Sequence, residues 1–230
     1  MLKCCMFINE QISKIKMYIK NLSKKQIQSI YMIAGLLTVA IACVIALQFY
    51  NSNNSKQILQ AATIYQRAII ASENHSISTA DKTAKFEAIA KQHSNTSYGI
   101  FASWKLADLY VTPTKLDTKT FNINIANTPK AIQVLQQSSE ANPKSNLTNI
   151  TKTRLAKLYL ISNQTDKAIK TLQSTADLQN NAYPLMLLGQ AYLQQKNKTK
   201  AIQAWQKAEQ DPNSSPEFKK IIVQLINNTI

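Results

Sequence analysis

Side chains that commonly carry out chemistry are few in this sequence and lie far apart. The histidines are His75 and His93, and the cysteines are Cys4, Cys5 and Cys43. A zinc site or a nucleophilic centre needs histidine, cysteine and carboxylate side chains that converge. The twelve carboxylates are dispersed, and no pair of them resembles a general acid and base. We therefore expect no catalytic residues, no metal site and no enzyme activity.

The glycines are equally sparse. Phosphate-binding and dinucleotide-binding loops need clustered glycines, because their backbone N–H groups must approach the phosphate. Gly35, Gly99 and Gly189 are isolated from one another. We therefore expect no bound cofactor. The function must instead be sought in the secondary-structure elements and the surfaces that they form.

The strongest pattern is a repeat with a period of 33 residues. Leu188, Gly189, Tyr192, Ala201, Ile202 and Trp205 correspond to Leu155, Ala156, Tyr159, Ala168, Ile169 and Leu172, and a third copy consists of Leu106, Ala107, Tyr110, Ala131, Ile132 and Leu135. This period and these residue types resemble the tetratricopeptide repeat, a unit of two helices. The predicted fold class is all-α, with a single transmembrane helix followed by a tetratricopeptide-like solenoid of helical hairpins.

The repeated residues have two interpretations. Tyr110, Tyr159, Tyr192 and Trp205 could stack on a ligand, or they could fill the spaces between hairpins, while alanine or glycine lets the two helices of a hairpin approach. Their recurrence in register favours packing. Partner-binding residues are then expected in the concave groove, on side chains that differ between repeats, and the sequence leaves them unknown.

Helices are predicted at 57–72, 84–90, 100–110, from Pro129, at 149–160, 165–172, 184–194 and 199–209, and after Ser215. The first two form a degenerate hairpin, and the last covers the end of the array. The segment 111–128 contains twelve extra residues. Loops of this length are functional or disordered, and we favour disorder for this one.

Residues 30–50 form an apolar segment, with no charge between Lys25 and Lys56. At about 1.5 Å per residue a helix of this length spans the roughly 30 Å hydrocarbon layer. Residues 40–43 resemble a lipoprotein cleavage site, but the apolar run continues beyond Cys43 and favours an uncleaved anchor. Six lysines precede it, so the N-terminus is expected in the cytoplasm and residues 51–230 in the periplasm, with 51–55 as a short linker.

Residues 1–29 form a basic amphipathic segment in which the apolar side chains recur at helical spacing. Such a tail could lie on an anionic leaflet or could be a solvated segment that only sets the topology, and the sequence leaves both interpretations open. The net charge of +15 is spread over polar segments and reflects a compositional bias. No nucleic-acid motif is present, so we expect no nucleic-acid partner.

Two segments resemble a known family. The run Asn95-Thr96-Ser97-Tyr98-Gly99-Ile100-Phe101-Ala102-Ser103 before Leu106-Ala107 is similar to a Tyr-Gly segment of the YfgM-type ancillary subunits of the SecYEG translocon, and the ending Ile226-Asn227-Asn228-Thr229-Ile230 is similar to theirs. The resemblance implies a bacterial inner-membrane protein that acts beside the translocon with a PpiD-like periplasmic chaperone and exported client proteins. The family's link to stress regulation is not carried over, because the basic tail and the loop after Tyr110 depart from its pattern.

We therefore expect a membrane-anchored, non-catalytic protein-binding module, an ancillary subunit of the SecYEG translocon that engages a periplasmic chaperone or emerging exported proteins. The alternative hypothesis is a scaffold for envelope or division assembly. Septal localisation would favour the scaffold, whereas copurification with the translocon would favour the first hypothesis.

Overall fold

The computed structural model describes residues 24–112, 125–176, 178 and 181–229, and its regular secondary structure there is helical throughout. The all-α prediction is thus confirmed. The predictions for residues 1–23 and for 113–124, most of the inserted loop, lie outside the described residues. The chain divides into two compact units, residues 1–56 and 57–230, and each is described by itself.

The first unit contains most of the long helix α2 (Lys24–Glu73). Large apolar side chains in its first half are exposed, including Leu36 at 71%, Val39 at 62% and Phe49 at 76%. A helix that is apolar on every side requires an apolar surrounding. Within the described residues, α2 is the one helix whose length and composition allow it to cross a membrane.

Residues 51–55 differ from the prediction, because they are helical and not a linker. The segment contains asparagine and serine but neither glycine nor proline. Asparagine and serine lower helix stability by less than about 0.7 kcal/mol each relative to alanine, which the helical residues on both sides can offset. Polar composition alone therefore predicted a break that does not occur.

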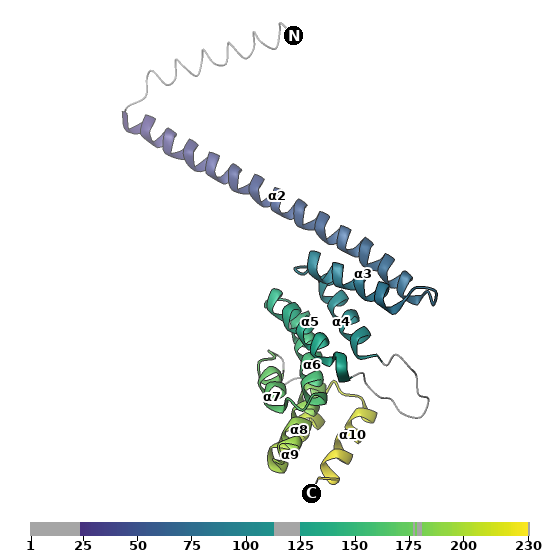
Figure 1. Ribbon diagram of the computed structural model, residues 1–230. Coiled ribbons are helices and arrows are strands. Elements are labelled where there is room, and N and C mark those ends of the chain that lie inside the picture. The colour runs from purple at the N-terminus through teal and green to yellow at the C-terminus, as the bar shows by residue number, and fades with distance from the viewer. Residues whose placement is uncertain (1–23, 113–124, 177, 179–180, 230) are drawn as a thin grey trace. The chain divides into compact units, whose positions relative to one another are not determined.

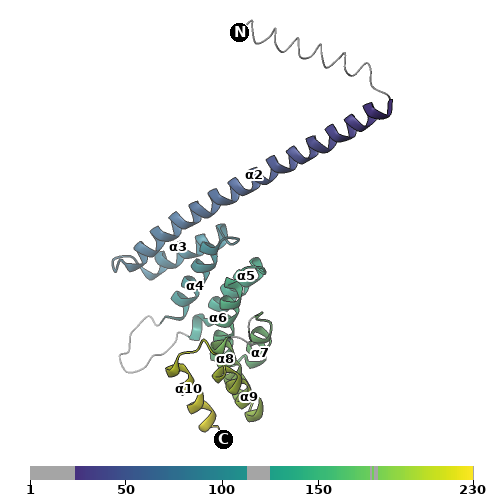
Figure 2. The same cartoon turned by 180° about the vertical axis from the view of Figure 1, so that it is seen from behind.

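The second unit is a series of antiparallel helical hairpins in which, from α3 onward, each helix packs on the next (Figures 1 and 2). The end of α2 pairs with α3 (Thr79–Gln92), α4 (Ser97–Val111) with α5 (Thr128–Ala141), α6 (Leu147–Ile161) with α7 (Thr165–Gln173), and α8 (Ala182–Gln194) with α9 (Lys198–Glu209). A short 3-10 helix, η1 (Ile125–Asn127), precedes α5, and α10 (Pro216–Asn227) packs against α9.

Local sequence signals explain where several helices begin. The Ser78 hydroxyl accepts a hydrogen bond from the Asp81 N–H and donates one to the Asp81 carboxylate. Ser215 likewise accepts from the Phe218 N–H at 3.2 Å. Pro129 and Pro216 occupy first-turn positions, where a missing N–H costs nothing. These caps supply partners for N–H groups that the helix itself leaves unpaired.

Two hydrophobic clusters form the core of this unit. One, which includes Phe86, Ile89 and Leu106, joins α3 and α4 to the end of α2. The other extends from α4 to α10 and contains Trp205 and most of the repeated residues. Because α4 contributes to both clusters, it connects the degenerate first hairpin to the regular repeats.

The two regular hairpins α6–α7 and α8–α9 turn in the same way. Asn163 and Lys196 have positive φ values of 55° and 60° and occupy equivalent places in the repeat. In each turn the next N–H donates to a tyrosine carbonyl, Gln164 to Tyr159 at 2.8 Å and Asn197 to Tyr192 at 2.9 Å. This is the Schellman arrangement, in which one left-handed residue ends a helix and satisfies its last carbonyls.

The corner between α3 and α4 is tight because of Gly99. A Cβ atom at this position would lie 2.0 Å from the carbonyl oxygen of His93. The buried Thr96 holds the corner, since its hydroxyl donates to the His93 carbonyl at 2.8 Å and accepts from the Gly99 N–H at 3.1 Å. The Tyr-Gly segment that carries the family resemblance thus lies at a corner with no space for a side chain at position 99.

Candidate partner-binding groove

Most of the residues expected to pack the repeats are buried. Those exposed by 7% or less are Leu106, Ala107, Ala131, Leu135, Leu155, Ala156, Tyr159, Ala168, Leu172, Leu188, Ala201 and Trp205, and Gly189 is also buried. Tyr110 and Tyr192 are half-buried. The structure brings thirteen of these residues, from Ala107 to Trp205, into or against one cluster that runs from α4 to α10.

A lysine that sequence reasoning missed accompanies each repeated tyrosine. The ammonium nitrogens of Lys130, Lys167 and Lys200 lie 5.9, 5.7 and 5.5 Å from the ring centroids of Tyr110, Tyr159 and Tyr192. Each of these lysines directly precedes the repeated alanine of the second helix. A cation over a ring face contributes roughly 0.5–1 kcal/mol at an exposed site, so the tyrosines pack the hairpins and also anchor a surface charge.

Two of the three Tyr–Lys pairs lie in grooves between the second helices of consecutive hairpins. Tyr110 and Lys130 line a groove of about 680 Å³ between α3 and α5. Tyr192 and Lys200 line the equivalent groove of about 360 Å³ between α7 and α9. Burial raises the pKa of the Tyr110 hydroxyl above its ordinary value, so this tyrosine stays neutral beside the lysine at physiological pH. The recurrence of these grooves indicates a packing feature of the repeat.

The first helices of the hairpins form a different groove. It has a volume of about 440 Å³ and is lined by residues of α4, α6 and α8, with Leu135 of α5 at its base. Its apolar lining includes Val111, Ile150 and Ile161, and Arg154 and Lys157 supply positive charge. We call it the inner groove, and it is our candidate for the partner-binding site.

Two exposed apolar side chains mark the inner groove. Ile150 is 47% exposed and Tyr183 is 40% exposed, although most other large apolar residues of their helices are buried. They stand 33 residues apart, so they occupy the same place in successive repeats, and Phe101 occupies that place in α4. Exposed apolar residues that line a concave surface are typical of binding sites.

Aromatic side chains continue from Phe101 along α4 and back to α2. The ring centroids of Phe101 and Trp104 are 5.4 Å apart, and those of Phe101 and Tyr65 are 6.2 Å apart. Tyr98 contacts both Tyr65 at 5.8 Å and Phe101 at 6.1 Å. Such tilted and edge-on pairs add roughly 0.5–1.5 kcal/mol each to simple burial. They fix the position of α4, and therefore one wall of the inner groove.

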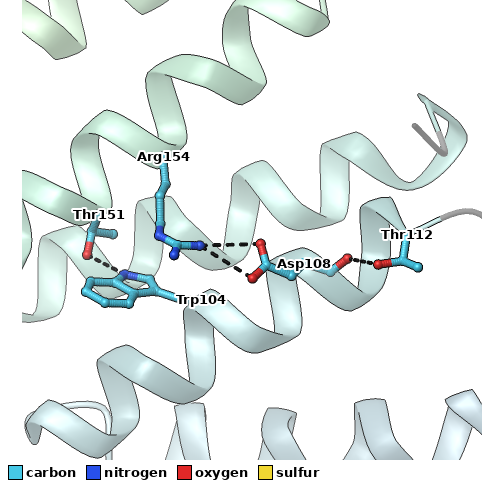
Figure 3. Close-up of polar contacts among 5 residues, drawn as sticks. All are labelled: Trp104, Asp108, Thr112, Thr151 and Arg154. Atoms are coloured by element: carbon cyan, nitrogen blue, oxygen red, sulfur yellow. Dashed lines mark hydrogen bonds and ion pairs between the residues drawn. The ribbon is translucent and has the colours of Figure 1, made fainter. Parts of the chain in front are cut away.

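Trp104 also contacts the next repeat, as Figure 3 shows. Its indole N–H donates to the Thr151 hydroxyl at 2.8 Å, and the Arg154 guanidinium carbon lies 4.9 Å from its ring centroid. Arg154 reaches both carboxylate oxygens of Asp108 at 3.4 Å. The two helices are thus joined by a hydrogen bond, a stacked cation and a long ion pair at the edge of the inner groove.

The residues considered for chemistry do not meet. His75 lies in the turn between α2 and α3, His93 ends α3, and Cys43 is exposed on α2. Among the described residues, no three histidine, cysteine or carboxylate side chains come close enough together to hold a metal ion.

Stacked helical hairpins with a 33-residue period and a groove lined by their first helices define a protein of the tetratricopeptide type. The chain belongs to the tetratricopeptide repeat-like domain family, whose family model matches residues 28–228. A thermophilic TPR protein of Thermus thermophilus has the same fold, with a TM-score of 0.53 and 13% identity over 73% of this chain and 81% of its own.

Two relatives have a more specific description. The chain is 26% identical to the ancillary SecYEG translocon subunit of Escherichia coli (strain K12), over 96% of this chain and 95% of that protein. It is 31% identical to the ancillary SecYEG translocon subunit of Buchnera aphidicola subsp. Schizaphis graminum (strain Sg), over 56% of this chain and 60% of that protein. The predicted resemblance to the YfgM-type ancillary subunits is therefore confirmed.

Proposed function

We propose that this protein is a membrane-anchored, non-catalytic subunit that binds other proteins beside the SecYEG translocon. The inner groove carries the proposal, because it combines the exposed apolar side chains of Ile150 and Tyr183 with the cations Arg154 and Lys157 in one hollow. The similarity to two ancillary translocon subunits supports the choice of the translocon as the setting.

The proposed arrangement places residues 1–29 in the cytoplasm, residues 30–50 across the inner membrane, and residues 51–230 in the periplasm. The apolar half of α2 supports the anchor, and the lysines before it support the orientation. A tethered domain binds a neighbouring protein in an effectively intramolecular event, so weak contacts are enough. The partners that we propose are a PpiD-like periplasmic chaperone and exported proteins that emerge from the pore.

The orientation can be tested with reporter fusions after Lys25 and after Lys56. A reporter that works in the cytoplasm should be active at the first position and inactive at the second, and an enzyme that needs the periplasm should show the reverse. Cytoplasmic activity after Lys56 would exclude a periplasmic site of action.

The function can be tested by photo-crosslinking in intact cells, with a photoreactive residue at Tyr183 in the inner groove. Gln206, an exposed residue of α9, is the matched control position. Tyr183 should crosslink to a translocon subunit or a periplasmic chaperone, and Gln206 should not. The proposal fails if neither class of protein crosslinks or copurifies from solubilised membranes, and localisation to the septum would instead support a division scaffold.

A further inference from the structure

Arg154 differs from the other charged residues of the inner groove in how it is held. Its guanidinium lies against the Trp104 ring, with 4.9 Å between the guanidinium carbon and the ring centroid. The attraction between cation and ring holds the guanidinium at the ring, and its N–H groups can still donate to a partner. A planar fork held in this way is suited to bind a carboxylate through two hydrogen bonds.

The support beneath Arg154 is rigid. The Trp104 indole N–H donates to the hydroxyl of Thr151, which is 1% exposed and itself donates to the Leu147 carbonyl at 3.0 Å. Figure 3 shows Thr151 and Arg154 on the same helix, and both reach the Trp104 side chain. The ring therefore cannot turn away without breaking a hydrogen bond, so the guanidinium is positioned before any partner arrives.

The carboxylate that Arg154 now contacts is loosely bound. Both Asp108 oxygens lie 3.4 Å from the same nitrogen, Nη1, whereas a strong charge-assisted hydrogen bond measures about 2.7–2.9 Å. The side chains are 42% and 59% exposed, so water competes for both of them. An exposed pair of this kind contributes little, and a better-placed carboxylate can replace Asp108.

The surroundings define what else the incoming group must carry. Ile150 and Tyr183 offer exposed apolar surface in the same groove, and Lys157 adds a second cation. The groove therefore has two cations against the single carboxylate of Asp108. Its volume of about 440 Å³ suits a few side chains of a polypeptide.

We propose that the inner groove binds an acidic, apolar segment of a partner protein, and that Arg154 takes the segment's carboxylate in place of Asp108. Ile150 and Tyr183 contact the apolar side chains of the same segment. Asp108 makes the site selective, because a lone carboxylate without apolar neighbours gains too little to displace it. This proposal rests on the proposed function as a protein-binding module and adds the chemistry of the partner.

The test uses the full-length chain in nanodiscs and two fluorescent peptides that differ at one position. Both contain leucine and phenylalanine one helical turn apart, and the neighbouring residue is glutamate in one and glutamine in the other. Fluorescence anisotropy should show that the glutamate peptide binds about five to ten times more tightly, which corresponds to roughly 1 kcal/mol or slightly more. The difference should shrink in high salt.

Three variants assign the effect to Arg154. Arg154→Gln should abolish the preference for glutamate, while Asp108→Asn should strengthen binding of the glutamate peptide about two- to threefold by removing the internal competitor. Lys152→Gln is the matched control, because Lys152 lies on the same helix but does not line the groove, and it should leave the preference unchanged. Circular dichroism melting confirms that each variant is folded.

The proposal is overturned if the two peptides bind equally, if neither binds, or if the preference survives in Arg154→Gln. Self-association of the chain in sedimentation, with no peptide binding, would assign the groove to a second copy and would also overturn it. Copurification with the translocon is measured separately. If copurification persists while the two peptides bind equally, this inference fails and the proposed function stands. If the peptides are discriminated but the translocon does not copurify, the proposed function fails and the selectivity of the groove stands.

Discussion

The hairpins α6–α7 and α8–α9 have the same turn and the same register, but they fill the crossing of their helices with different pairs of residues. In α6–α7 the pair is Ala156 and Leu172, and in α8–α9 it is Gly189 and Trp205. All four residues are buried. A larger residue on one helix thus accompanies a smaller residue on the other. The smaller residue on the first helix makes room for part of the larger side chain on the second, as close packing requires.

The largest expected effect comes from Gly189→Ala. The new Cβ would lie 2.2 Å from the Trp205 indole nitrogen, and the ring cannot move aside because it is fully buried and donates to the Met186 carbonyl. We expect a loss of about 3 kcal/mol, despite alanine's higher helix propensity. For a chain of this size that lowers the melting temperature by roughly 6–12 °C in calorimetry.

The double variant Gly189→Ala with Trp205→Leu tests the volume argument directly, because it rebuilds the α6–α7 pair in α8–α9. Trp205→Leu alone leaves a cavity and should cost about 2–4 kcal/mol. The double variant should be more stable than either single variant, so its loss of stability should be smaller than the sum of the two single losses. Additive losses would show that the two crossings are not interchangeable. Ala156→Gly is the matched control and should cost only about 1 kcal/mol.

The next prediction is a pH-dependent change in stability, and it concerns the hairpin α8–α9 but not α6–α7. The buried Asp211 accepts hydrogen bonds from the backbone N–H groups of Asn213 and Ala182, each at 2.9 Å, whereas the equivalent residue after α7 is the apolar Leu178. The Asn213 N–H contributes most, and with the Ala182 N–H, the Ser214 hydroxyl and the Lys219 charge it lowers the pKa of Asp211 below 3.8.

A lowered pKa in the folded state means that Asp211 stabilises the fold above its ordinary pKa. This contribution is lost as the pH falls through the folded-state value. Asp211→Asn should therefore lower the melting temperature at pH 7 and should have a smaller effect near pH 3. Thermal melts of both proteins across this range measure the difference. An equal difference at every pH would mean that the carboxylate charge contributes nothing.

The smallest expected change in stability concerns the turns that connect α6 to α7 and α8 to α9. Asn163 and Lys196 both adopt a left-handed backbone, which asparagine tolerates better than lysine does. Lys196→Asn should stabilise the protein by about 0.5 kcal/mol, and Asn163→Lys should destabilise it by a similar amount. Chemical denaturation resolves changes of this size when the variants are measured side by side. Effects of the same sign in both turns would show that backbone strain does not distinguish them.

Much of the fold could be predicted from the sequence because its signals are local or periodic. The period placed the helices from α4 to α9 to within about three residues, and Pro129 and Ser215 marked helix starts. Residues 51–55 were predicted wrongly as a linker, because polar composition was given more weight than the missing glycine and proline. The lysines over the tyrosine rings were also missed, although their constant spacing before the repeated alanine would have revealed them.

The site could be predicted only in outline. The partner was expected on side chains of the concave groove that differ between repeats, and this stays a prediction. The exposed Ile150 and Tyr183 of the inner groove share one register position but differ in identity. The repeat pattern does not indicate a role for Arg154, since the residues at the same repeat position are Lys105 and Leu187. Its role depends on Trp104, 50 positions earlier in the chain, and only the packing of α4 against α6 brings the two together.

The two tryptophans of the chain give it two built-in fluorescent reporters in contrasting surroundings. Trp205 is fully buried and hydrogen-bonded, so its emission should be blue-shifted and should change only when α8–α9 unfolds. Trp104 is half-buried under a guanidinium at the edge of the inner groove, so its emission should respond to whatever enters that groove. One spectrum, recorded without any label, can therefore distinguish occupancy of the groove from loss of the fold.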